Sequence, residues 1–282
     1  MSQVLLSIAS STLLTLLLLL TAIGLEFVGA MERYSLRARL PGFLMSAVGT
    51  PLSLGLAWQL QQLWNGLGLG AVVVIPLWRW LEPYGNLGYG AQIALLVIVA
   101  DFLVYWRHRA EHAWFWPIHV VHHAATELHA ANDIAHPLQT LYDFALVSVP
   151  LSLVQIDGPQ TPFVVAGIVL LASMCIHSPV KWHAGVFRRI IVDNRYHRIH
   201  HSMESRHFDK NFGILLSIWD HLFGTAYEPS EEWPAVGVAD TPQPRSIVEY
   251  LVLPLACLAA RRRWVPASER AVATVQPEDP RS

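Results

Sequence analysis

Long apolar runs separated by short polar segments dominate the first two thirds of the chain. The first run, residues 4–28, is almost uncharged and exceeds the roughly 20 residues that a helix needs to span a bilayer. A second run covers residues 43–64, with an interruption near Pro51, and a third covers residues 90–106 and ends against Arg107. The pattern therefore predicts three membrane-spanning helices.

The remaining apolar segments are shorter than a span. Residues 71–81 place an arginine between two tryptophans, a combination suited to the lipid headgroup layer, and we expect an interfacial or re-entrant segment there. Residues 138–154 and 163–176 are separated by an Asp-Gly-Pro turn. These two segments predict a helical hairpin.

Basic residues after the first run predict the orientation of the protein. Arg33, Arg37 and Arg39 follow the run directly, so the positive-inside rule places this end in the cytoplasm and the N-terminus outside. A cleaved signal peptide is the alternative, but the run has no basic n-region and exceeds the roughly 7 to 15 apolar residues of such peptides. With this topology every histidine cluster faces the cytoplasm. We expect a multi-pass integral membrane protein.

Composition supports this interpretation and excludes other classes. Hydrophobic residues make up 53% of the chain and charged residues 14%, and the mean hydropathy is +0.37. The net charge of -2 gives no basic face, so we expect no nucleic acid as a partner. Cys175 and Cys257 are too few for a disulfide framework or a thiolate zinc site. The predicted fold is an all-α polytopic membrane bundle with a cytosolic, histidine-rich helical cap.

Eight of the fourteen histidines fall into three short boxes, HRAEH, HVVHH and HRIHH. Histidines three or four apart share one face of a helix, and adjacent histidines can touch two metals from one turn. Eight imidazoles exceed what one zinc ion needs, so the boxes predict a dinuclear site. Iron, copper, zinc and nickel all accept imidazole, and the spacing does not choose among them. The eight are His108, His112, His119, His122, His123, His197, His200 and His201.

The order of the boxes, with apolar runs before the first and a hairpin before the last, resembles the fatty acid hydroxylase and sterol desaturase superfamily. Four further segments match: AHPLQ (135–139), IHSPV (176–180), DKNFG (209–213) and WDHLFGT (219–225). The resemblance covers about residues 90–228, which it implies to be the catalytic domain. Residues 1–89 would then form N-terminal transmembrane and interfacial helices, and residues 229–282 a C-terminal segment with a disordered tail.

The resemblance implies a non-haem centre of two iron ions, with zinc as a possible substitute, that uses O2 to hydroxylate or desaturate a lipid. By position its ligands are the eight box histidines, His177 as a ninth, and His136 as a tenth that either binds metal or hydrogen-bonds a ligand. The substrate would be sterol-like, fatty acyl or related. The sequence has no dinucleotide fingerprint and no haem-attachment motif, so electrons must come from a separate reductase, ferredoxin or cytochrome.

Two rival functions make different demands on the sequence. A membrane zinc-dependent hydrolase needs a base placed as in HExxH, whereas HRAEH puts Glu111 beside the second histidine. A histidine-rich metal transporter or sensor would spread ligands over several depths of the bilayer, whereas these lie at span ends.

Other polar residues near the boxes have weaker grounds for a role. Asp101 and Glu111 could each orient an imidazole N–H. Four histidines fall outside the family pattern and are left out of the predicted site: His129, His183, His207 and His221.

Overall fold

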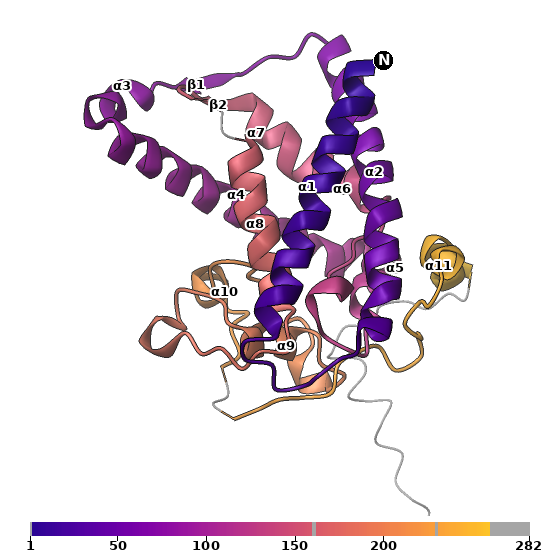
Figure 1. Ribbon diagram of the computed structural model, residues 1–282. Helices are drawn as coiled ribbons and strands as arrows, with labels where there is room; N and C mark the ends of the chain where they lie inside the picture. The colour runs from indigo at the N-terminus through magenta and orange to yellow at the C-terminus, as the bar shows by residue number, and fades with distance from the viewer. Residues whose placement is uncertain (1, 160–161, 229–230, 260–282) are drawn as a thin grey trace, which may run out of the picture.

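Two of the three long helices, α1 (Ser2–Glu26) and α2 (Leu36–Gly66), stand upright side by side, and the third, α4 (Asn86–Trp114), runs obliquely from the corner labelled α3 toward the centre of the molecule (Figure 1). The computed structural model describes residues 2–159, 162–228 and 231–259. Within these residues the three helices are each long and apolar enough to cross a membrane. The interruption expected near Pro51 is wrong, because α2 continues through it. An apolar helix can lose one main-chain hydrogen bond to proline without ending.

Short elements close the end of the bundle nearest the N-terminus. They are β1 (Val73–Ile75), α3 (Trp78–Leu81) and the 3-10 turn η1 (Glu82–Tyr84). β1 pairs in parallel with β2 (Val154–Ile156), and the carboxylate of Asp157 accepts a hydrogen bond from the amide of Trp78 at 2.7 Å. The pattern did not predict these strands, because three residues are too few to show alternation.

The predicted hairpin is present, with an irregular first arm. That arm comprises α6 (Gln139–Asp143), the π-helical η3 (Phe144–Ser148) and α7 (Val149–Leu153). After β2, the second arm is α8 (Pro162–Ile176), whose 15 residues give a length of about 22 Å. This is less than the roughly 30 Å of a hydrocarbon core.

Short helices and loops gather at the opposite end and form a cap (Figure 1). They are α5 (Trp116–His123), η2 (Ala130–Asn132), η4 (Gly185–Phe187), α9 (Asn194–His200), η5 (Ser205–His207) and α10 (Ile218–Phe223). Together with the long helices they confirm the predicted helical bundle with a histidine-rich site.

One further helix, α11 (Ile247–Ala259), packs against α5 and α2, and the sequence pattern did not predict it. The hydroxyl of Tyr250 in α11 donates a hydrogen bond to the carbonyl of Ala135 at 2.5 Å. The tail expected to be disordered, residues 260–282, lies outside the described residues.

A buried ion pair joins the first two spans to the cap. Arg39 of α2 pairs with Glu26 of α1, and a second carboxylate oxygen of Glu26 accepts from the amide of Ala130 at 2.6 Å. One of the three arginines behind the orientation prediction is therefore an internal partner, which leaves Arg33 and Arg37 exposed.

Candidate metal centre

Nine buried histidines converge in the cap as two neighbouring groups, and each group can hold one metal ion. The first group contains His108, His112, His119, His123 and His200, and the second contains His122, His177, His197 and His201. All nine were predicted as ligands from the sequence.

The helical positions of the histidines explain this division. Residues four apart on a helix lie on one face, so the two histidines of α4 enter the same group. Adjacent residues are turned by about 100° from each other. In α5, His122 and His123 therefore point to different groups, and His200 and His201 at the end of α9 do the same.

Distances between the ring nitrogens match the edges of a metal coordination sphere. In the second group, Nε2 of His177 lies 3.2 Å from Nε2 of His122, 3.0 Å from that of His197 and 3.2 Å from that of His201. Metal–imidazole bonds of about 2.0–2.1 Å give ligand–ligand edges of about 3.0 Å in octahedral and about 3.4 Å in tetrahedral geometry. In the first group, Nε2 of His123 lies 3.1 Å from Nε2 of both His112 and His119.

Main-chain carbonyls determine which ring nitrogen carries the proton. A carbonyl can only accept, so Nδ1 of His108 donates to Phe212 at 2.8 Å, and Nδ1 of His200 donates to Lys210 at 2.7 Å. Nδ1 of His177 donates likewise to the carbonyl of Ser173 at 2.7 Å. The Nε2 lone pairs then face inward.

These inward lone pairs fit a metal ion. Within the described part of the chain, Nε2 of His108 and of His200 has no hydrogen-bond partner. Buried acceptors that face one another at about 3 Å are unfavourable without a shared proton or cation. The donor set is purely imidazole, which suits iron, copper, zinc or nickel.

Burial keeps the imidazoles neutral. Loss of hydration, followed by repulsion from neighbouring imidazoles, holds the pKa of six cap histidines well below the usual value. They are His119, His122, His123, His197, His200 and His201. Neutral imidazole is the form that binds metal.

Carboxylates lie behind several rings. Asp209 accepts from Nδ1 of His112 at 3.3 Å, and a carboxylate oxygen of Glu111 lies 3.4 Å from Nδ1 of His119. Asp133 lies 3.7–3.8 Å from Nδ1 of two rings in the second group. Of these, sequence reasoning proposed only Glu111. The position of Asp209 at the start of the DKNFG segment was the available signal for it.

Asp101 does not contact a histidine. Its buried carboxylate accepts from the amides of Leu215 and Leu216 at 3.0 and 3.1 Å and from the indole of Trp219 at 2.8 Å. It therefore fixes to α4 the loop that follows DKNFG, and these bonds offset the burial of its charge in an apolar helix.

The DKNFG segment presents its carbonyls through an unusual backbone. Asp209 and Asn211 have φ values of 57° and 60°, in the left-handed region that asparagine and aspartate tolerate best. Asp220 accepts from the amides of Phe212 and Gly213, both at 2.8 Å. The segment is thereby held with its carbonyls toward the two histidines that they orient.

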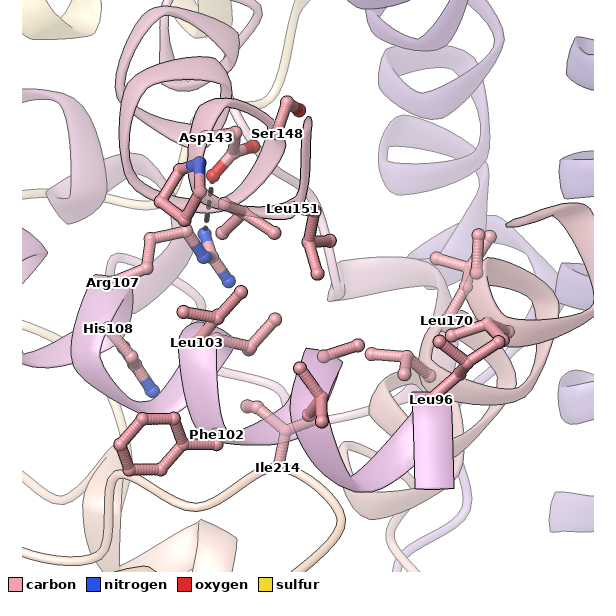
Figure 2. A pocket seen from close by; sticks show the side chains of 18 of the residues that line it. Leu96, Phe102, Leu103, Arg107, His108, Asp143, Ser148, Leu151, Leu170 and Ile214 are labelled. Atoms are coloured by element: carbon pink, nitrogen blue, oxygen red, sulfur yellow. Dashed lines mark ion pairs between the residues drawn. The ribbon is translucent and has the colours of Figure 1, made fainter. Parts of the chain in front are cut away.

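A cavity of about 920 Å³ opens on the histidines (Figure 2). It lies between α4, the first arm of the hairpin and α8. His108, His119 and His122 line one end of it, and Leu96, Leu103, Leu151 and Leu170 are among the apolar side chains of its walls.

Comparison with known proteins supports a family for the chain. Residues 93–225 match the model of the fatty acid hydroxylase family. This match covers just under half of the chain, and together with the curated relatives it supports the fatty acid hydroxylase and sterol desaturase superfamily. The resemblance stated from the histidine boxes is confirmed.

Several curated relatives of this superfamily are similar to the chain. Ornithine lipid hydroxylase OlsE of Rhizobium tropici is 32% identical over 142 residues, which are 49% of this chain and 42% of the relative. Human alkylglycerol monooxygenase is 29% identical over 134 residues, 47% of this chain and 30% of the relative. Very-long-chain aldehyde decarbonylase GL1-8 of Oryza sativa subsp. indica is 28% identical over 170 residues, which are 56% of this chain and 58% of the relative. The chain thus spans less than half of the first two relatives. No solved structure matches it significantly.

His136, in the superfamily's HP element, is not brought into either histidine group. Its Nδ1 accepts from the amide of Leu138 at 3.1 Å, and its Nε2 lies 3.3 Å from the carbonyl of Leu251 in α11. Both ring nitrogens are occupied by the main chain, so the geometry supports neither proposed role for it, as a ligand or as a partner of a ligand.

The four histidines omitted from the prediction also lie outside the two groups. His207 instead approaches Glu204 and Glu232, a third cluster that geometry alone permits to bind metal. Arg206 bonds both carboxylates, at 2.7 and 3.0 Å, which identifies a salt-bridge network at the surface. The other three are His129, His183 and His221.

Proposed function

We propose that the protein is a membrane-bound di-iron oxygenase that hydroxylates or desaturates a lipid. One observation carries the proposal: the two groups of buried imidazoles open directly on a largely apolar cavity. His108 and His119 of the first group and His122 of the second group line this cavity. A metal centre lined this way can meet an apolar substrate without water between them.

Iron bound in the two groups would supply the activation of O2. Hydroxylation replaces a C–H bond by C–OH and releases one water, whereas desaturation removes two hydrogens and releases two waters. Each reaction consumes one O2, two electrons and two protons. The chain orients the imidazoles through Nδ1, as at Phe212 and Lys210, and its cavity would hold the lipid carbon beside His108.

Electrons would come from a separate reductase, ferredoxin or cytochrome. We further propose that residues 90–228 act as the catalytic domain and that the metal site faces the cytoplasm, on the side marked by Arg33 and Arg37. The three candidate spans support the proposal that the protein is multi-pass and integral to the membrane.

The relatives support the substrate class. Their names specify an ornithine lipid, an alkylglycerol and a very-long-chain aldehyde, all of them molecules with a long apolar part. From these names we infer only the substrate class of this protein, which is a membrane lipid whose apolar chain fills the cavity.

The test combines metal analysis with lipid analysis. The protein is purified in detergent, its metals are measured by elemental analysis, and lipids of cells with and without it are compared by mass spectrometry. We expect two irons per chain and a lipid that gains a hydroxyl group or a double bond. Zinc alone, with no oxidised lipid, would contradict the proposal and favour the hydrolase.

Histidine variants connect the metal to the activity. His122→Ala should lower the metal content and abolish the product, because it removes one of four nitrogens from the second group. His183→Ala is the matched control, since His183 is exposed and lies in neither group. Full activity of His122→Ala would refute the ligand assignment.

A further inference from the structure

Charged side chains are distributed unevenly along the cavity. α4 runs along it, from Gln92 near the β1–β2 end to Arg107 at the histidine end, a distance of about 22 Å for fifteen residues. The charged residues that line the cavity are Arg107, Glu111, Asp133 and Asp143, and all of them lie toward the histidines. Beyond them the lining is mainly aliphatic, with the uncharged Gln92 near the far end.

Arg107 and Asp143 form the charged pair on the cavity wall (Figure 2). Their closest nitrogen and oxygen are 3.1 Å apart, and the same guanidinium nitrogen lies 2.6 Å from Glu111. Glu111 is fully buried, whereas 39% of the Asp143 side-chain surface is free of protein contact. The pair therefore offers both a donor and an acceptor to a ligand in the cavity.

The orientation of an amphipathic lipid follows from this distribution. Placing a methyl end against an ion pair strips water from both charges and returns no hydrogen bond. At the other end, Gln92 carries no charge: its amide N–H donates to the carbonyl of Asp157 at 3.2 Å, and its Oε1, which has no hydrogen-bond partner among the described residues, is a neutral acceptor. The length of about 22 Å exceeds one leaflet, about 15 Å, so an ordinary lipid chain can extend from the pair toward β2.

We propose that Arg107 and Asp143 bind the polar head group of the substrate, and that the oxidised carbon is therefore close to the head group rather than to the methyl end. The ligand class is a lipid whose head group both donates and accepts hydrogen bonds. The proposal rests on the proposed function for its chemical outcome but not for its binding site. Arg107 directly precedes His108 on α4, which brings the head group near the metal centre.

Binding tests the head-group site without catalysis. Purified, metal-loaded protein is titrated with monohexadecanoylglycerol and with hexadecane by displacement of a fluorescent lipid, and the ratio of the two affinities is compared between variants. Asp143→Asn and Arg107→Gln should each lower this ratio about tenfold, the loss of one hydrogen bond to a charged group. Gln155→Leu, at the opposite end of the cavity, is the matched control and should keep the ratio. An unchanged ratio in both head-group variants overturns the proposal.

Analysis of the oxidised products tests in which direction the lipid chain lies along the cavity. Val165 lines the cavity near the start of α8, at the end distant from the histidines. Val165→Phe should favour shorter chains and leave the oxidised position, counted from the head group, unchanged. If the oxidised position, counted from the head group, differs between Val165→Phe and the wild type, the head group lies at the end of the cavity distant from the histidines. If the wild-type protein oxidises no lipid, the proposed function fails, and the binding ratios still decide the head-group site.

Discussion

At Gly42, α2 lies directly against the cap, so Gly42→Ala tests whether this contact supports the metal centre. A Cβ at this position would lie 1.9 Å from the carbonyl oxygen of Ala131 and 2.9 Å from Oδ1 of Asn132. Both belong to η2, which Glu26 holds through the amide of Ala130 at 2.6 Å. The neighbour is main chain that is already fixed, so it cannot move aside easily.

The size of the effect follows from a comparison with Gly55 on the same helix. A Cβ at Gly55 has nothing within 4 Å. Both substitutions gain the same helix propensity, about 1 kcal/mol, because both replace a glycine inside α2. The difference between them is the overpacking penalty at Gly42, about 1–3 kcal/mol, and the contact with a carbonyl oxygen places it near the upper end.

The assay is thermal unfolding of the two variants in one detergent, together with their metal content. Gly55→Ala should be at least as stable as the wild type, and Gly42→Ala should be less stable than both. Since η2 leads into Asp133, which lies behind His122 and His177, we also expect weaker metal retention in the second group. Equal stability of the two variants would refute the argument that α2 and η2 are in rigid contact.

Three further predictions concern the histidines and their partners. Metal-free protein should lose stability as the pH falls below about 6.5, because the histidines of the unfolded chain then bind protons that the six folded ones with lowered pKa do not. The free energy of unfolding should fall by at most about 1.4 kcal/mol per pH unit for each of these histidines. An unfolding free energy in detergent that does not change with pH would contradict this prediction. Asp220→Asn leaves the amide of Phe212 or of Gly213 without its acceptor, and this disturbs the Phe212 carbonyl to which His108 donates. A chelator titration should therefore show about 10–100-fold weaker metal binding in the first group alone. His136→Ala should keep both metals by elemental analysis, and loss of one would restore His136 as a ligand.

The sequence could predict the box histidines because helical spacing already contains their geometry. In HVVHH, His119 and His123 are four apart and lie in one group, whereas His122, which is adjacent to His123 and turned away from it, lies in the other. His177 could not be predicted from spacing, because it directly follows α8 and stands apart from the three boxes. Only the resemblance of its segment to the family motif indicated it. The three long helices were predictable for a similar reason, namely that apolar length is a local property.

The partners of the ligands could not be predicted in this way. The carbonyls of Ser173, Lys210 and Phe212 have no sequence signature, because every residue carries one. The environment of His136 depends on Leu251 in α11, a helix more than a hundred residues away that the pattern did not predict. A match to a family motif located this histidine, but only tertiary packing determined what its nitrogens contact.

The placement of the carboxylates follows from the charge that a dinuclear centre would bring into the cap. Two divalent ions held by neutral imidazoles carry their full charge into a poorly solvated site, where uncompensated charge is costly. Carboxylates in direct coordination would neutralise the ions, yet here Glu111, Asp133 and Asp209 lie behind the rings, at Nδ1. From there they offset charge and fix ring orientation while every inward position remains imidazole. With ions bound, the cap would therefore separate binding of the ions, by histidine, from compensation of their charge, by carboxylates in the outer layer.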